Sequence, residues 1–413
     1  MGRDAPGQTL EREPVTQVNR RRALQLLAAL GTAGLVAGCG DSSESETDAP
    51  LSPIKIGMLI PQTGDLTDVG TEVANGFQLF LDLNEGQLGG HPTSLVTVDE
   101  GNDAKSGQAA VEKLLKQGVL ALTGVVSSAV MLGIRDKVEQ AQVPLVGSNA
   151  SPSSLQSVVY IWRTSYVLDE VGRALGHYLK EALAPSERLA IIMPESPASQ
   201  DVLRGFQQEF GKSDPRIGDP VTWTEEISGT PGKSAYRRDI ATALKRDPDG
   251  VFCFFAGAAA VEFLKQLRAE GYTGPIYAPG FLTEGNVLAS FKDETDVLGI
   301  QTALNYSPDL NNAANRLFAS AYRKKHGTSP TAYATASYDA AHVLNQAIRR
   351  AGESPTPPAV NLALGKIGRV DSPRGVWQFN QPRTPQQRWY LREVQLDGQL
   401  LSNVLLTELA TLG

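Results

Sequence analysis

Residues 55–115 decide the fold of this chain, and they read KIGMLIPQTGDLTDVGTEVANGFQLFLDLNEGQLGGHPTSLVTVDEGNDAKSGQAAVEKLL. Short apolar runs of strand length at 55–60 and 94–100 alternate with segments of helical period at 72–85 and 104–118. Strands that are separated by helices pair in parallel through right-handed crossovers. This stretch therefore predicts an α/β fold.

The same alternation continues along the chain and restarts near Asp169, so the sequence predicts two α/β lobes. Further strands are predicted at 119–125, 143–148, 188–194, 220–227, 250–257 and 275–280, at the start of the stretch that follows Leu298, and around GVWQF (375–379) and QRWYLREV (387–394). Further helices are predicted at 129–142, 168–183, 200–211, 234–246, 259–271, 313–326 and 335–351.

The segment before the folded part has the pattern of an export signal. Three arginines, Arg20–Arg22, precede an apolar run at 23–36 that is shorter than the roughly 20 residues of a membrane-spanning helix. Its end, Leu35-Val36-Ala37-Gly38-Cys39, resembles a bacterial lipobox, which implies cleavage before Cys39 and diacylation of the Cys39 thiol. We expect a signal peptide at 1–38 and a flexible, lipidated tether at 39–53.

Two readings of this segment stay open. Asn19-Arg20-Arg21 also resembles a twin-arginine signal, although Ala23 stands where that motif has an aromatic residue. The segment is alternatively a short uncleaved anchor, or the lipobox match is accidental.

Charge and cysteine content limit the classes of partner. The formal charge is −7, and removal of 1–38, with five Arg and three acidic residues, makes it −9. An acidic chain has no general attraction for nucleic acid. Once Cys39 is lipidated, Cys253 is the one cysteine left, so no disulfide forms within the chain. Cys253 lies in an apolar run and is predicted to be a small buried hydrophobic residue.

Short sequence segments along residues 54–400 resemble those of a known family. The phrases are those of 55–115 together with TGVVSSAV, VPLVGSNASPSSL, WRTS, GVFCFFAGAAAVEFLKQLRAEG, PIYAPG and YATASYDAAHVLNQAI, in this order. They are similar to type I periplasmic binding proteins of the leucine/isoleucine/valine-binding kind, the solute receptors of ABC importers for hydrophobic amino acids and amides. The resemblance implies a Venus-flytrap of two Rossmann-like lobes with parallel sheets, joined by a three-strand hinge. It puts lobe 1 at 54–168 with 304–375 and lobe 2 at 169–303 with 376–413.

Two strand ends carry groups that suit an anion. Ser127 and Ser128 follow one strand and open a helix, and Ser148 to Ser151 follow the next. Ligands of open α/β sheets bind beyond the carboxyl ends of strands, and unpaired N–H groups at a helix start attract negative charge. The alternative is that these serines only cap helices. The resemblance implies that Ser128 and Ser151 bind a ligand's α-carboxylate, and that the Asn149 carbonyl meets its amine.

The chain departs from the amino-acid binders of that family. Gly280, next to Phe281, stands where the resemblance implies a carboxylate for the ligand's ammonium. The resemblance implies aromatic residues around the ligand at four positions. Tyr333 keeps an aromatic ring, and smaller residues stand at the other three, Val69, Ala198 and Ala256. An unpaired buried ammonium is costly. The expected ligand is therefore a carboxylate or amide without an α-ammonium, with an aromatic one suiting Tyr333, unless Glu195 or Glu284 supplies the acid.

No catalytic or metal-binding motif accompanies these residues. The sequence has no G-x-S-x-G elbow and no H-E-x-x-H pair, and a near match to a phosphate loop at 229–234 has Ile227 where Gly is required. We predict no catalytic residue, no metal and no cofactor. The favoured function is a monomeric, lipid-anchored receptor that closes on a small ligand and delivers it to a membrane permease. A sensory receptor of the same fold is the alternative, and an exported hydrolase is the least favoured.

Overall fold

The computed structural model describes residues 51–223 and 236–413, and residues 50–413 form one compact unit. The predicted signal peptide, Cys39 and most of the predicted tether lie outside the described residues, as do parts of the strand and helix predicted at 220–227 and 234–246. Within the described residues, every helix is too short or too polar to cross a bilayer.

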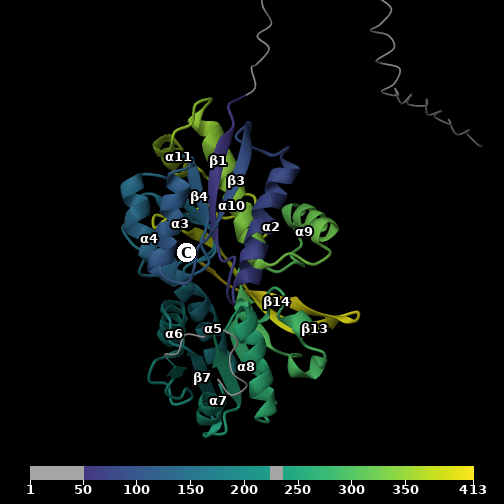
Figure 1. The fold of residues 1–413 in the computed structure, drawn as a ribbon. Coiled ribbons are helices and arrows are strands. Elements are labelled where there is room, and N and C mark those ends of the chain that lie inside the picture. Colours follow the sequence, from purple (N-terminus) through teal and green to yellow (C-terminus); the bar gives the residue numbers. More distant parts are fainter. Residues whose placement is uncertain (1–50, 224–235) are drawn as a thin grey trace, which may run out of the picture. The chain divides into compact units, whose positions relative to one another are not determined.

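The first sheet has six strands among the described residues, in the order β2-β3-β1-β4-β5-β6 (Figure 1). All neighbours pair in parallel except β2, which forms a hairpin with β3. Its strands are β1 (Ile54–Ile60), β2 (Gln87–Leu88), β3 (His91–Asp99), β4 (Ala121–Gly124), β5 (Leu145–Gly147) and β6 (Ile161–Arg163).

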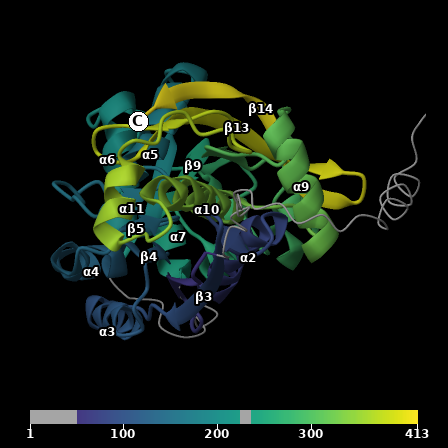
Figure 2. The same cartoon turned by 90° about the horizontal axis from the view of Figure 1, so that it is seen from above.

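Helices cover both faces of this sheet. In β1, Ile56 and Met58 pack with α2 (Thr67–Leu83) and α10 (Ala332–Ala351), whereas Leu59 packs on the opposite face. Successive strand residues point to opposite faces, so a strand covered on both sides is apolar throughout. The opposite face is covered by α3 (Ala104–Leu115) and α4 (Ser128–Ala141), which lie side by side in Figures 1 and 2. We call this sheet and its helices the first lobe; it also includes α9 (Ala313–His326) and α11 (Pro357–Leu364).

The second sheet has the strand order β12-β13-β11-β10-β9-β7-β8, with β14 on the free side of β13. Its strands are β7 (Leu189–Pro194), β8 (Val221–Trp223), β9 (Gly250–Cys253), β10 (Ile276–Pro279), β11 (Gln301–Leu304), β12 (Gln378–Phe379), β13 (Pro385–Asp397) and β14 (Leu400–Leu412). Its helices are α5 (Leu168–Ala182), α6 (Pro197–Phe210), α7 (Arg237–Leu244) and α8 (Gly257–Ala269), with short 3₁₀ turns at Gly280–Thr283, Leu288–Ser290 and Glu294–Asp296. We call this the second lobe.

Three chain segments connect the two lobes, after β6, after β11 and before β12. Side chains tie these segments together. The Ser165 carbonyl accepts from Arg374 Nη1 at 3.3 Å and from Gln387 Nε2 at 3.0 Å. Asn305 Nδ2 donates to Gln387 Oε1 at 2.8 Å. The three connections therefore share one buried hydrogen-bond network.

The predicted fold class is confirmed: the chain is α/β, and both sheets are mostly parallel. Cys253 is buried, as predicted. The second sheet also has an antiparallel part, in which β13 pairs with β11, β12 and β14. A turn at Gly398, where φ is +66°, joins β13 to β14 and makes an antiparallel hairpin possible.

Element boundaries differ where caps rather than periodicity set them. Helix α2 begins at Thr67, five residues before the predicted start, because Thr67 N–H donates to the Gly64 carbonyl and opens a turn of polar residues. Helix α10 begins at Ala332, capped by the Thr331 side chain. The sequence-based prediction missed β2, β6, α11 and β14. Strand β6 has only three residues, too few for a periodic pattern.

Candidate ligand-binding site

The carboxyl end of β4 leads into helix α4, as the sequence predicts, but its N–H groups are partly used by the protein itself. Glu100 is fully buried and accepts from Val126 N at 2.8 Å and from Ser127 N at 2.9 Å. Ser127 is the N-cap, and its side chain accepts from Val130 N. Ser128 makes no capping bond, and its N–H has no partner among the described residues. Capping is therefore the role of Ser127, and Ser128 is not needed as a cap.

Glu100 does not bring a negative charge to this strand end at neutral pH. Burial raises the pKa of Glu100 to about 8, against the lowering effect of its two backbone hydrogen bonds. Around pH 7 the carboxyl is mostly protonated and does not repel a nearby anion. Sequence reasoning missed this residue because nothing in Asp99-Glu100 marks one of the two acids as buried.

The carboxyl end of β5 holds two hydroxyl groups without partners. Ser148 and Ser151 are 1% and 0% exposed, and neither Oγ has a hydrogen-bond partner among the described residues. Asn149 between them is engaged, because its Nδ2 donates to the Val126 carbonyl and its own carbonyl accepts from Ser165 Oγ at 2.8 Å. Residues 152–155 form a turn rather than a helix, so Ser151 caps nothing.

A row of stacked aromatic rings leads away from this strand end. Tyr166 follows Ser165, and its ring centroid lies 5.9 Å from that of Phe281. Phe281 stacks in turn on Tyr333, at 5.7 Å and with only 7° between the ring planes. The Tyr166 hydroxyl is buried without a partner. The row thus joins the first lobe, the loop after β10 and the start of α10.

Gly280 and Glu284, which follow β10, are both engaged with Arg392 of β13. Arg392 is fully buried, and its Nη1 donates to Glu284 Oε1. A Cβ placed on Gly280 would lie 2.6 Å from Arg392 Nη2 and 2.7 Å from Leu304 Cδ2, so Gly280 does not face open space. The other Glu284 oxygen accepts from Ala332 N at 3.1 Å. In the sequence, this arginine shows only as a charge inside an apolar strand.

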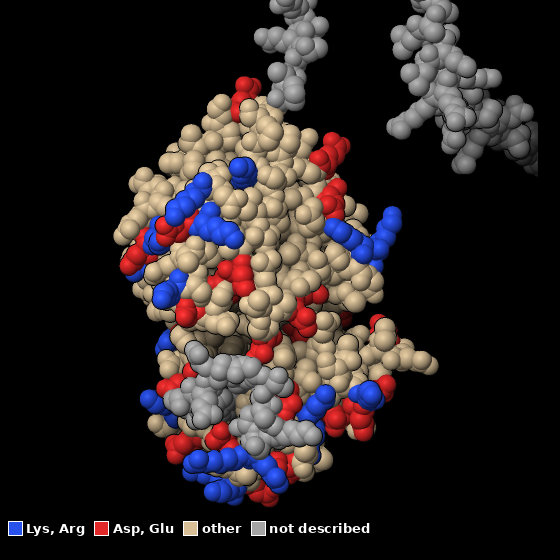
Figure 3. Space-filling model, viewed as in Figure 1, with Lys and Arg blue, Asp and Glu red and all other residues tan. Residues whose placement is uncertain are grey.

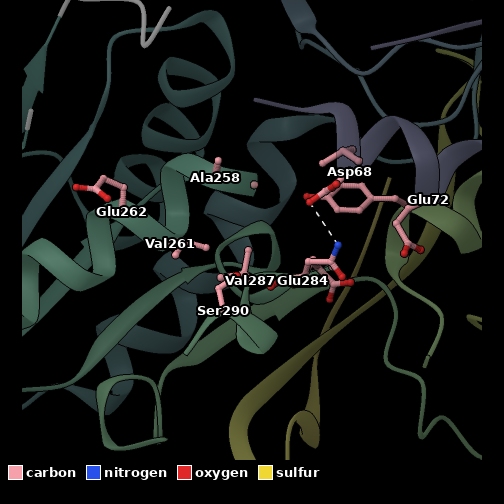
Figure 4. Close-up of a pocket in the computed structure, with 13 residues that line it drawn as sticks. Asp68, Glu72, Ala258, Val261, Glu262, Glu284, Val287 and Ser290 are labelled. Carbon is pink, nitrogen blue, oxygen red and sulfur yellow. Dashed lines mark hydrogen bonds between the residues drawn. The ribbon is translucent and has the colours of Figure 1, made fainter. Parts of the chain in front are cut away.

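A cavity of about 240 Å³ lies where the row of rings ends (Figure 4). Its acidic lining residues come from three places: Asp68 and Glu72 from α2, Glu262 from α8, and Glu284 from the loop after β10. The apolar part of the wall includes Val69, Val261, Val287 and Tyr333. Burial raises the pKa of Glu72, whose Oε2 accepts from Tyr322 and Thr331. Figure 3 shows several acidic side chains near the middle of the view, between its upper and lower parts.

Hydrogen bonds join the two lobes on both sides of the aromatic row. On one side, Asn286 Nδ2 donates to Asp68 Oδ2 at 3.3 Å. On the other, Asp201 of α6 accepts from Ser153 N and Ser153 Oγ, both at 2.7 Å. The row and the unpartnered serines therefore lie in a region that the two lobes close off.

Most of the predicted site residues lie at one of two places, the carboxyl ends of β4 and β5 or the cavity and the rings beside it. Ser128, Asn149 and Ser151 lie at the strand ends, while Val69 and Tyr333 line the cavity and Phe281 stacks on Tyr333. Ala198 and Ala256 are half-buried at the starts of α6 and α8, outside the cavity wall, and Glu195 is exposed. The roles of these residues toward a ligand remain predictions. Within the described residues no cluster of side chains could hold a metal ion.

The sequence model of the family described as periplasmic binding protein matches residues 53–399 of this chain. Among curated relatives, the Leu/Ile/Val-binding protein homolog 6 of Brucella melitensis is 23% identical over 355 residues, with 83% of this chain and 87% of the relative covered. The Leu/Ile/Val-binding protein homolog 8 of Brucella suis is 25% identical over 361 residues, with 81% and 84% covered.

Two solved structures illustrate the range of similar proteins. The solute-binding protein of an ABC transporter from Rhodopseudomonas palustris, in complex with benzoate, is 26% identical, with a TM-score of 0.79, and 87% of this chain and 97% of that chain are covered. The leucine-binding protein LivK of Thermotoga maritima is 21% identical, with a TM-score of 0.76 and with 86% and 98% covered. The second likeness concerns the fold alone.

Proposed function

Because the chain belongs to the periplasmic binding protein family, whose location is extracytoplasmic, we propose that this solute-binding protein is the receptor of an ABC importer for a small aromatic monocarboxylate. The ligand lies between the two lobes, with its carboxylate at the ends of β4 and β5 and its ring along Tyr166, Phe281 and Tyr333. The closed receptor then delivers the ligand to a permease.

The observation that carries this proposal is the Ser151 hydroxyl, which is fully buried and has no hydrogen-bond partner among the described residues. The Ser151 carbonyl accepts from Leu168 N at 3.2 Å, two residues after Tyr166, where the aromatic row begins. A buried hydroxyl without a hydrogen bond is costly, so a ligand acceptor at this point supplies what the protein leaves open. The unpaired N–H of Ser128 adds a second donor at the positive end of α4.

The surroundings favour a carboxylate without an ammonium group. Both oxygens of Glu284 already have partners, and Gly280 offers no side chain. The stacked rings favour an aromatic ligand, since aromatic pairs add about 0.5–1.5 kcal/mol beyond the area they bury. The likeness to a benzoate complex, at 26% identity, supports the same class.

The acidic cavity restricts the far end of the ligand. Asp68, Glu72 and Glu262 border it, and among the residues that the structure describes no lysine or arginine does. A second carboxylate there would meet like charge, whereas a ring hydroxyl could donate to one of these acids. The ligand is therefore a monocarboxylate such as benzoate or 4-hydroxybenzoate rather than a dicarboxylate.

A thermal-shift screen tests this assignment, with calorimetry on the ligands that stabilise the protein. Benzoate and 4-hydroxybenzoate should raise the unfolding temperature, since a hundred-fold excess over Kd stabilises the folded state by about 2.7 kcal/mol. Terephthalate is the matched control with a second carboxylate, and leucine is the control with an α-ammonium. Stabilisation by leucine, with none from the aromatic acids, would show that the ligand class is wrong.

Cys39 is proposed to hold this receptor at the membrane. The supporting observation is the short apolar run at 23–36 that ends directly before Ala37-Gly38-Cys39. An acyl chain on Cys39, followed by the polar segment 40–53, would leave the folded unit free to meet the permease.

A further inference from the structure

We propose that Arg392 helps to decide the charge class of the ligand, because it neutralises Glu284 from within the protein and so withdraws one of the four acids that border the cavity from a cationic ligand. This inference rests on the proposed function and names the residue that sets its specificity. Glu284 borders the cavity, and Arg392 lies behind it on β13.

The guanidinium is held firmly in this position. Arg392 is fully buried; its Nη1 donates to Glu284 Oε1 and, at 3.1 Å, to the Tyr306 carbonyl, and its Nη2 donates to Thr302 Oγ1 at 3.3 Å. The Tyr306 carbonyl and the Thr302 hydroxyl are uncharged, so they do not balance the charge of the guanidinium. A buried charge is tolerated when it is paired and hydrogen-bonded, and Glu284 is the carboxylate that pairs this one.

Gly280 makes this arrangement possible. A side chain at this position would place its Cβ 2.6 Å from Arg392 Nη2, closer than non-bonded atoms approach. The same Cβ would lie 2.7 Å from Leu304 Cδ2, so there is no room on the other side. A glycine that follows β10 therefore lets Arg392 reach Glu284.

Both oxygens of Glu284 already accept a hydrogen bond from the protein. Its Oε2 accepts from Ala332 N, the first N–H of α10, at 3.1 Å. The other acids at the cavity also accept hydrogen bonds: Asp68 from Asn286, Glu72 from Tyr322 and Thr331, and Glu262 from Gln266. A ligand ammonium beside Glu284 would therefore meet a carboxylate whose charge is already balanced.

Removal of the guanidinium should reverse this preference. Arg392→Ala leaves the Glu284 carboxylate buried, unpaired and next to both the cavity and the space that the guanidinium filled. An uncompensated buried charge strongly destabilises a protein, and a small cation that fills the space restores the balance. The variant should thus acquire a cation site that the wild-type protein lacks.

Methylguanidinium and ethylammonium are the probes, added at millimolar concentration while the unfolding temperature is measured. Arg392→Ala should unfold at a lower temperature than the wild type and recover by several degrees with either probe, whereas the wild type does not respond. Arg388→Ala is the matched control, because Arg388 lies on the same strand in an exposed ion pair with Glu408. The double variant Arg392→Ala/Glu284→Gln should lose the response.

A second variant tests the reverse case and does not depend on the folding of Arg392→Ala. Glu284→Gln leaves the guanidinium unbalanced, so its affinity for benzoate should rise at least threefold, and terephthalate should now bind. If neither variant changes its preference between cations and carboxylates, Arg392 has only a structural role and the inference is wrong. If cations restore Arg392→Ala while the wild type binds no carboxylate, the role of Arg392 stands and the proposed ligand class falls.

Discussion

At the scale of single residues, the two buried serine hydroxyls after β5 distinguish a binding site from a packed core. Most buried polar groups have hydrogen-bond partners, whereas Ser148 and Ser151 have none among the described residues and lie together at one strand end; Ser337 of α10 is a further buried serine without one. Ser127, one loop away, shows the contrast, because its side chain caps α4. The pair of unpartnered hydroxyls is therefore the best local indication of where a ligand accepts hydrogen bonds.

Ser151→Ala should separate binding from stability. Removal of a buried, unpartnered hydroxyl should leave the unfolding temperature unchanged or slightly higher, because no hydrogen bond is lost. A hydrogen bond to a charged group is worth about 1.5–3 kcal/mol, so the affinity for benzoate should fall by about ten-fold or more. Calorimetry measures both, with Ser154→Ala in the same loop as the exposed control. Unchanged affinity would move the carboxylate site elsewhere.

Glu100 should make stability depend on pH. Its pKa is about 8 in the folded state, raised from 4.5 by burial, so between these values the folded state holds a proton that the unfolded chain has lost. Stability from this group is present below pH 4.5 and is lost as pH rises toward 8. Between pH 5 and pH 8 the wild type should lose about 1–2 kcal/mol or more relative to Glu100→Gln.

Urea unfolding at the two pH values measures this difference. Glu195→Gln, at an exposed carboxyl, is the control and should follow the wild type. Parallel loss of stability in the wild type and Glu100→Gln would mean that Glu100 is ionised in the folded protein.

At the scale of elements, helix α6 and the loop after β5 form a contact that joins the two lobes. Asp201 is 5% exposed, accepts two hydrogen bonds from Ser153 and pairs with Arg204 at 2.6 Å. Ser153 belongs to the first lobe and Asp201 to the second, so a hinge motion that separates the lobes breaks both bonds.

Asp201→Asn should therefore shift the equilibrium toward the open form. The neutral amide keeps one acceptor, so the closed form loses part of its stabilisation and the affinity for benzoate should fall several-fold. Small-angle scattering of the ligand-free variant should show a larger radius of gyration than that of the wild type. Asp136→Asn, on the exposed face of α4, is the control and should change neither quantity. An unaltered radius and affinity would show that this contact does not bias closure.

At the scale of the whole molecule, the predicted lipid on Cys39 would hold the folded unit at a membrane. Cys39→Ser should abolish incorporation of labelled palmitate and release the protein from the membrane fraction of its native host. Binding of benzoate by the released protein should be unchanged, because Cys39 precedes the tether at 40–53 and the folded unit. Labelling that persists in Cys39→Ser would contradict the lipoprotein prediction.

The sequence by itself determined the α/β alternation, because strand and helix periods are local properties of the chain. Helix α9 spans the predicted residues 313–326, and the strand predicted at 55–60 became β1 with one residue more. It also determined that Gly280 carries no acid and that Ser128 and Ser151 follow strand ends. Each of these statements follows from residues that are close together in the chain.

Only the tertiary structure decided which of these groups remain free. Glu100 reaches the N–H groups of Val126 and Ser127 from 26 and 27 residues away, and Arg392 reaches Glu284 across 108 residues. Neither pairing leaves a local signal, because a buried ion pair or a protonated acid has the same sequence as an exposed one. Whether a polar side chain is satisfied by the protein or left for a ligand depends on contacts between distant segments, and the packing of both lobes sets those contacts.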